Sequence, residues 1–204
     1  IYGTGYKRAP DGQIVYGEDG YPLLADDLIY LGDSNPKGKG SFGTEIKYKG
    51  ISLNILFDGQ FGGKGYSFTN AMLMEHGKHE KTLSGRYNGI IGDGVIENPD
   101  GTYRKNDVVA EEIWTYYTRH GGRENLEGSM FNTDFLKLRE LTLSYSFPAR
   151  ICKKIGMRKL SVGIYGRDLF MITNWPAFDP EFGTLNNGTI DKGFEIAQFP
   201  ATRN

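Results

Sequence analysis

Long stretches of strictly alternating apolar and polar side chains constrain this chain more than any other feature. Ile51, Leu53, Ile55, Phe57 and Phe61 fall on one side of an extended strand, and the residues between them are mostly polar. A period of two residues is that of a β-strand, whose side chains point alternately to the two faces of its sheet. About ten residues also suffice for a tilted strand to cross a bilayer, whereas strands of soluble sandwiches usually have about 5–6.

Other segments alternate in the same way, at 42–48, 135–147 and 160–172. Their connections differ sharply in length, and because successive antiparallel strands leave a sheet at opposite ends, the short ones must share one rim. Outer-membrane barrels show this asymmetry, with short periplasmic turns and long extracellular loops. The short connections are 49–50 and 148–158, and the long ones are approximately 1–40, 62–134 and 174–195.

The segment from Phe135 to Phe147 changes phase partway along. Leu136 and Leu138 share one parity, but the apolar positions from Leu141 onward have the other. A shift by one residue would exchange the two faces of the strand. We therefore predict a β-bulge near Glu140, which restores the phase.

Asp168 presents a related problem, because it falls among the apolar positions of the last alternating segment. A local bulge or a position above the hydrocarbon would account for it.

Within the longest connection, the spacing of apolar residues predicts a helix that starts at an Asp107 cap, continues through His120 and stops at Gly121-Gly122.

Composition supports an all-β membrane protein. The 204 residues include 29 glycines, 13 tyrosines and 12 phenylalanines, which suits strands with tight turns and aromatic girdles. The net charge of −1 gives no reason to expect nucleic acid as a partner, and a single cysteine, Cys152, excludes an internal disulfide. We predict an antiparallel transmembrane β-barrel segment with long extracellular loops at about 1–40, 62–134 and 174–195.

Several short motifs follow one another along essentially the whole chain. In order, they are Tyr30-Leu31-Gly32-Asp33-Ser34-Asn35-Pro36, Tyr48-Lys49-Gly50-Ile51-Ser52-Leu53, Asp58-Gly59-Gln60-Phe61-Gly62-Gly63, Ala71-Met72-Leu73, Lys81-Thr82-Leu83, Leu136-Lys137-Leu138-Arg139-Glu140-Leu141-Thr142-Leu143-Ser144-Tyr145, Gly166-Arg167-Asp168-Leu169-Phe170, Phe178-Asp179-Pro180-Glu181 and Phe199-Pro200-Ala201-Thr202-Arg203. Each is weak alone, but their order and spacing are specific. Together they resemble the C-terminal region of SusC/RagA-family TonB-dependent transporters of Bacteroidetes.

The resemblance implies a location and a set of partners. The family forms large plugged barrels of about 22 strands in the outer membrane of Gram-negative bacteria, and imports nutrient oligomers, either glycans or peptides. Implied partners are the rest of the barrel and its plug, a SusD-like surface lipoprotein, the TonB complex through the N-terminal region, and outer-membrane lipid. In the family pattern a closing strand follows Pro-Ala-Thr-Arg, so we expect these residues to lack both that strand and the plug.

Two groups of side chains are candidates for contact with substrate or partner. Loop aromatics, which could stack on sugars or pack against peptides and the lid protein, are Trp114, Tyr116, Tyr117, Trp175 and Phe178. For each of them taken singly, packing within the loops or an interfacial girdle is the favoured explanation. Candidates for lining the lumen are Glu45, Lys47, Asp58, Lys137, Arg139 and Arg167. Cross-strand ion pairing is the competing explanation for this second group.

No arrangement of residues predicts catalysis, a metal or a cofactor. His76, His79 and His120 fit no zinc spacing, and nucleophile–base pairs are lacking. We therefore expect no enzyme. The alternative function is a soluble carbohydrate-binding or adhesion β-domain. In that case the apolar sides of the strands would pack against one another across two sheets.

Overall fold

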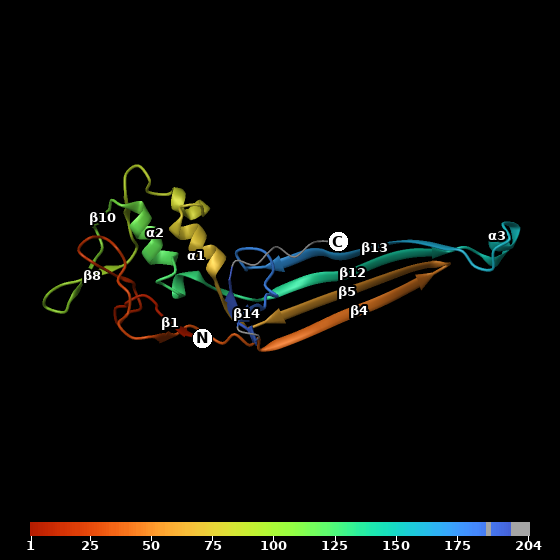
Figure 1. The fold of residues 1–204 in the computed structure, drawn as a ribbon, viewed down its shortest axis with the longest axis horizontal. Coiled ribbons are helices and arrows are strands. Elements are labelled where there is room, and N and C mark those ends of the chain that lie inside the picture. Colours follow the sequence, from red (N-terminus) through yellow and green to blue (C-terminus); the bar gives the residue numbers. More distant parts are fainter. Residues whose placement is uncertain (187–188, 197–204) are drawn as a thin grey trace.

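A long antiparallel sheet dominates the computed structural model, which describes residues 1–186 and 189–196 (Figure 1). Its four strands are adjacent in the order β13-β12-β5-β4. They are β4 (Gly38–Tyr48), β5 (Ile51–Phe61), β12 (Phe135–Ser146) and β13 (Ser161–Thr173), of 11 to 13 residues each. These are the alternating segments of the sequence. The Phe199–Arg203 motif lies outside the described residues.

The connections sort by length between the two ends of the sheet (Figure 1). At one end, Lys49 and Gly50 join β4 to β5 with φ of 45° and 89°, the two positive values that a two-residue type I′ hairpin turn requires. The short helix α3 (Ala149–Lys154) lies at this same end, between β12 and β13. The long connections gather at the other end.

The two faces of the sheet differ in character. Leu143 is opposite both Leu53 of β5 and Ile164 of β13, so apolar side chains from neighbouring strands form continuous rows on one face. Thr142, one residue away, is opposite Asn54 and Tyr165 on the other face. In the described part of the chain these apolar side chains belong to a single sheet and do not meet across two.

The predicted phase change is present as a pair of adjacent bulges. Leu138 is opposite Phe57 and Glu140 is opposite Leu56, which leaves Arg139 as an extra residue of β12 against β5. Against β13, Leu138 is opposite Phe170 and Glu140 is opposite Arg167, so here the extra residue belongs to β13. Asp168 lies in this second bulge with a φ of 46°, a conformation that Asp tolerates better than most residues. The bulge near Glu140 is confirmed, and a bulge also accounts for Asp168.

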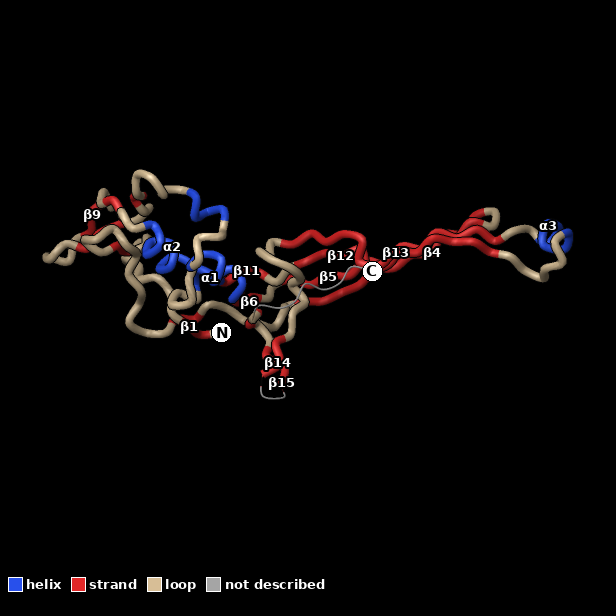
Figure 2. Tube along the Cα trace, turned by 45° about the horizontal axis from the view of Figure 1, so that its top comes forward, coloured by secondary structure: helices blue, strands red, loops and turns tan. Residues whose placement is uncertain are grey.

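Short strands and helices make up the remainder (Figure 2). The short strands pair as β1 (Tyr2–Gly3) with β3 (Ile29–Tyr30), β2 (Val15–Tyr16) with β8 (Val95–Glu97) and β8 with β9 (Tyr103–Lys105), β7 (Ile90–Ile91) with β10 (Val109–Ala110), β6 (Lys64–Ser67) with β11 (Met130–Asn132) and β16 (Phe194–Glu195), and β14 (Thr184–Asn186) with β15 (Thr189–Asp191). The helices are α1 (Phe68–Glu75) and α2 (Ile113–Gly121), with 3₁₀ turns at Glu80–Leu83 and Glu127–Ser129. No helix of the described residues has the length and apolar character that a membrane span needs.

The predicted helix is shorter than the sequence suggests. It begins at Ile113 and not near Asp107, because Val109 and Ala110 form strand β10 against β7. Asp107 does not cap it and instead forms an ion pair with Arg104. The predicted stop is correct, since α2 ends at Gly121.

Buried carboxylates tie distant segments to α1. Glu195 accepts hydrogen bonds from Ser67 Oγ at 2.9 Å and from the backbone N–H of Thr69 at 3.0 Å, at the positive end of the helix. Glu75, in the last turn of α1, accepts from the backbone N–H of Arg123 at 2.7 Å and from its Nε at 2.9 Å. The longest connection is therefore a packed unit that is fixed both internally and to the segment after β13.

His120 of this unit lies within a cluster of tyrosines, two of which come from the N-terminal connection. Its Nδ1 is 3.2 Å from the Tyr6 hydroxyl, its Nε2 is 3.1 Å from the Tyr16 hydroxyl, and its ring centroid is 4.4 Å from that of Tyr116. Burial lowers the pKa of His120 to about 4, because desolvation disfavours the charged imidazolium.

We expect the packed unit to lose stability as the pH falls from about 6.5 toward 4. Between these pH values His120 is protonated in the unfolded chain but stays neutral in the folded one, so lowering the pH favours unfolding. Above the unfolded pKa, His120 is neutral in both states and adds no pH dependence to the stability. The full shift corresponds to at most about 3 kcal/mol, and the partial exposure of the ring reduces this to roughly 1–2 kcal/mol. Urea titrations at pH 5 and 7.5, followed by ¹⁹F NMR of fluorotryptophan at Trp114, measure the effect. His120→Gln, which does not titrate, should remove the difference; an equal difference in this variant would exclude His120 as its source.

Candidate functional site

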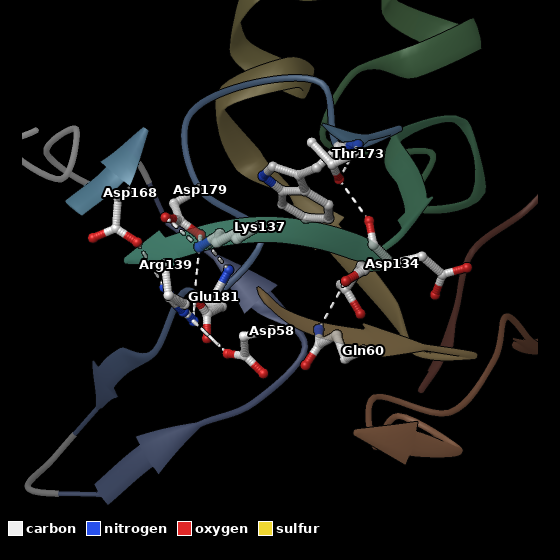
Figure 3. Close-up of polar contacts among 11 residues, drawn as sticks. Asp58, Gln60, Asp134, Lys137, Arg139, Asp168, Thr173, Asp179 and Glu181 are labelled. Carbon is white, nitrogen blue, oxygen red and sulfur yellow. Dashed lines mark hydrogen bonds and ion pairs between the residues drawn. The ribbon is translucent and has the colours of Figure 1, made fainter. Parts of the chain in front are cut away.

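A cluster of charged side chains lies on the polar face of the sheet, close to the long-connection end (Figure 3). We call it the bulge cluster. It consists of Asp58, Lys137, Arg139, Asp168, Asp179 and Glu181. The two bulges create it, because they bring Arg139 of β12 and Asp168 of β13 side by side within the sheet.

Lys137 is the buried centre of the bulge cluster, with only 4% of its side chain exposed. Its Nζ donates to both carboxylate oxygens of Asp179, at 2.6 and 2.7 Å, and also to Glu181. The ammonium also lies 4.7 Å from the centroid of the Phe135 ring. A buried ammonium is tolerated only with such partners, since desolvation without them would be far too costly.

Arg139 joins both neighbouring strands to the same connection. Its Nε and Nη2 donate to one oxygen of Asp58 on β5, at 3.0 and 2.9 Å. Its Nη1 donates to Asp168 on β13 at 3.1 Å, and Nη2 also donates to Glu181. The planar guanidinium suits this role, because its several donors point in fixed directions to separate acceptors.

Uncharged contacts complete the junction between sheet and connections (Figure 3). Gln60 Nε2 donates to the carbonyl of Thr133 at 2.7 Å, and Thr173 Oγ1 donates to the carbonyl of Asp134 at 2.7 Å. Trp175 stacks on Phe182 with ring centroids 4.7 Å apart. Ion pairs therefore hold the chain that follows β13 against the polar face, and aromatic contacts join Trp175 to Phe182 of the same chain and to Phe131 of β11.

The bulge cluster ties the segment after β13 to the sheet and gives this part of the polar face a net charge. Two cations face four carboxylates, which leaves a formal excess of two negative charges. Beside Arg139 the face carries an open hollow of about 420 Å³, whose lining includes Asp58, Arg167 and Asp168. The arrangement offers no nucleophile paired with a base. In the described part of the chain, no group of three His, Cys, Asp or Glu side chains is placed to hold a metal ion.

The residues proposed to line a lumen share the polar face. Asp58 and Lys137 are opposite each other in the β5–β12 ladder, and Arg139 lies beside them in the bulge. Arg167 is opposite Glu140 and forms a 3.3 Å ion pair with it. Glu45 and Lys47 pair with each other at 2.9 Å near the short-turn end. The structure thus contains ion pairs at all these positions, including the cross-strand kind that the sequence leaves open as an alternative.

The five aromatic candidates lie in different environments. Trp114 is 61% exposed and lines a hollow of about 400 Å³ beside α1, where Tyr117 also contributes. Tyr116 and Tyr117 are buried, and their rings meet edge to face with centroids 5.2 Å apart. Trp175 is buried between Phe131 and Phe182. Phe178 is exposed and has a positive φ of 60°. Of the five, only Trp114 and Phe178 are therefore exposed at the surface, and the other three pack inside.

Three acidic members of the bulge cluster were not among the predicted site residues, namely Asp168, Asp179 and Glu181. The sequence nevertheless contained a signal for each. Asp168 breaks the alternation of its strand, and Asp179 and Glu181 belong to the short Phe178–Glu181 motif in the last long connection. What could not be read from sequence was that this motif folds back onto Lys137.

No family model matches the sequence. The chain is similar to TonB-dependent receptors of Formosa agariphila, with 23% identity to receptor P39 over 178 residues, 86% of this chain and 16% of the relative. Receptor P3 is 24% identical over 199 residues, 95% of this chain and 18% of the relative. The chain thus spans less than a fifth of the length of these relatives.

Structures of the RagAB peptide importer are among the solved structures with a similar fold. The RagAB peptide importer in its 'closed-closed' state matches with a TM-score of 0.60 and 17% identity, over 98% of this chain and 21% of that chain. Its 'open-open' state gives a TM-score of 0.55 with the same identity and coverage. At this identity the likeness shows a common fold. The relatives are receptors and transporters, and not enzymes.

Proposed function

Since the chain is SusC/RagA-like over most of its length, we propose that it forms part of the barrel wall of an outer-membrane, TonB-dependent transporter for nutrient oligomers. The transported oligomers are peptides or glycans. RagAB is a peptide importer, which supports peptides, while the names of the curated receptors state no substrate. The full transporter would work with a SusD-like lipoprotein and with the TonB complex acting through its plug.

The observation that carries this proposal is the uncovered apolar face of the sheet. Ile164 is 71% exposed, and Val162, Phe42 and Ile172 are similarly open. A soluble protein rarely leaves so large an apolar patch in contact with water. Hydrocarbon would cover it at no such cost, and the 11 to 13 residues of each strand suffice to cross a bilayer at the usual tilt.

This assignment gives the sheet an orientation in the outer membrane. The connections at 1–40, 62–134 and 174–195 would be extracellular, and the Lys49-Gly50 turn and α3 would face the periplasm. The polar face would line the lumen, so that the bulge cluster lies in the wall near its extracellular end. Trp114 and Phe178 would then be the exposed aromatic contacts for substrate or lipoprotein.

Spin labelling of the full-length transporter in lipid vesicles tests the proposal. In a Cys152→Ser background, we expect a label at Leu143→Cys to collide mainly with oxygen, which dissolves in lipid. A label at Thr142→Cys, on the opposite face, should collide mainly with a water-soluble nickel complex. Shielding of position 143 from both reagents would indicate a second packed sheet and would favour the soluble carbohydrate-binding or adhesion domain instead.

A further inference from the structure

A second polar hollow, of about 490 Å³, lies where the long-connection end of the sheet meets the segments before β4 and after β13. Separate stretches of the chain contribute to its lining, which makes it a product of the tertiary fold. Its polar lining includes Ser34, Asn35, Lys39, Gln60, Lys64 and Lys192. Glu181 of the bulge cluster forms part of the same wall.

The three lysines of this hollow place positive charge beside the net-negative bulge cluster. Lys39 comes from β4, Lys64 from β6 and Lys192 from the segment before β16. None of them forms an ion pair with any residue that the structure describes, in contrast to Lys137 of the neighbouring bulge cluster. Glu181 is the acidic group of the lining, and it is already engaged by Lys137 and Arg139.

Two of the lysines are held in place by the backbone. Lys39 is opposite Gln60 in the β4–β5 ladder, on the same polar face as Asp58. The stem of Lys64 packs directly on Gly32, where an added Cβ would lie 2.5 Å from Lys64 Cγ. Gly32 has a φ of 138°, which also favours glycine at this position. Part of the entropy cost of ordering the Lys64 side chain is therefore met before any ligand arrives.

We propose that this hollow binds an anionic group of the transported oligomer, a carboxylate or a sulfate, so that the substrate class is an acidic oligomer. The inference rests on the proposed function and deepens it. Three cationic groups around one concave site raise the local concentration of anions and favour their capture. Lysine ammonium groups suit oxyanions as flexible point charges, and Ser34 and Asn35 in the same lining offer neutral hydrogen-bond donors.

Equilibrium binding to the purified full-length transporter tests this inference. The probes are hexaglutamate and hexaglutamine for peptides, and oligogalacturonate and a neutral galactose oligomer for sugars. We expect the acidic member of one pair to bind more tightly than its neutral counterpart, and the pair that discriminates identifies the source of the anion. Lys39→Gln, Lys64→Gln and Lys192→Gln should each weaken acidic binding by about threefold, and the triple variant by about 30-fold.

Two controls separate this inference from the proposed function. Lys105→Gln removes an exposed lysine of β9 that does not line the hollow, and should leave acidic binding unchanged. The exposed single variant Lys192→Gln provides a readout even if the triple variant folds poorly. Equal binding of acidic and neutral probes, or undiminished acidic binding in the triple variant, would overturn the inference while import of neutral oligomers still upheld the transporter. Failure of the full-length protein to insert into the outer membrane would overturn both.

Discussion

Lys137→Met is expected to release the segment after β13 from the polar face of the sheet. The methionine retains most of the stem but removes the ammonium, which is the buried partner of Asp179 and Glu181. Removing one partner of a buried ion pair typically costs about 3–5 kcal/mol. Because both carboxylates are about one-third exposed and can be rehydrated, we expect about 2–3 kcal/mol here.

Hydrogen–deuterium exchange of the full-length transporter measures this loss directly. Amides between residues 174 and 183 should exchange at least about 30-fold faster in Lys137→Met, which corresponds to about 2 kcal/mol of local opening. Lys47→Met is the matched control, because Lys47 lies on the same face, is 69% exposed and, among the described residues, forms an ion pair with Glu45 alone. Unchanged exchange in Lys137→Met would mean that other contacts, such as that of Trp175 with Phe131 of β11, hold the segment without the ions.

A double variant distinguishes loss of the Lys137–Glu181 ion pair from a general effect of the Lys137 substitution on folding. Adding Glu181→Gln to Lys137→Met removes one of the two carboxylates that the lost ammonium had neutralised. The two substitutions should therefore cost less together than the sum of their separate costs, since both act on one interaction. Strict additivity would show that Lys137 and Glu181 act independently.

The strands of the sheet could be predicted from sequence, because each one carries its signal locally. Strand alternation, the Lys49-Gly50 turn and even the bulge at Arg139 appear as changes in period or phase along the chain. These patterns arise from the backbone itself, which sends successive side chains to opposite faces. The sorting of connections between the two ends then follows from antiparallel pairing alone.

The packed unit within 62–134 and the bulge cluster could not be predicted to the same extent, because distant contacts determine them. The stretch 109–110 matches a helical period but pairs as β10 with β7, so a tertiary contact overrode the local signal. The N-terminus of α1 is completed by Glu195, more than a hundred residues later. Likewise, no local pattern indicates that Asp179 meets Lys137.

Ile164→Arg is expected to destabilise the folded transporter in lipid by about 2–4 kcal/mol, which is the cost of an arginine on the lipid face of a barrel strand. The neighbouring Tyr165→Arg should cost less than about 1 kcal/mol, because its side chain lies on the polar face beside Glu140. Without the bilayer, both side chains are exposed, Ile164 at 71% and Tyr165 at 56%. Contacts within the protein therefore predict similar changes in stability for the two substitutions. Urea titration of the protein folded in lipid vesicles, read by electrophoretic mobility before and after heating, supplies both values. Equal tolerance at the two positions would mean that the apolar face meets water rather than hydrocarbon, and the barrel assignment would fail with it.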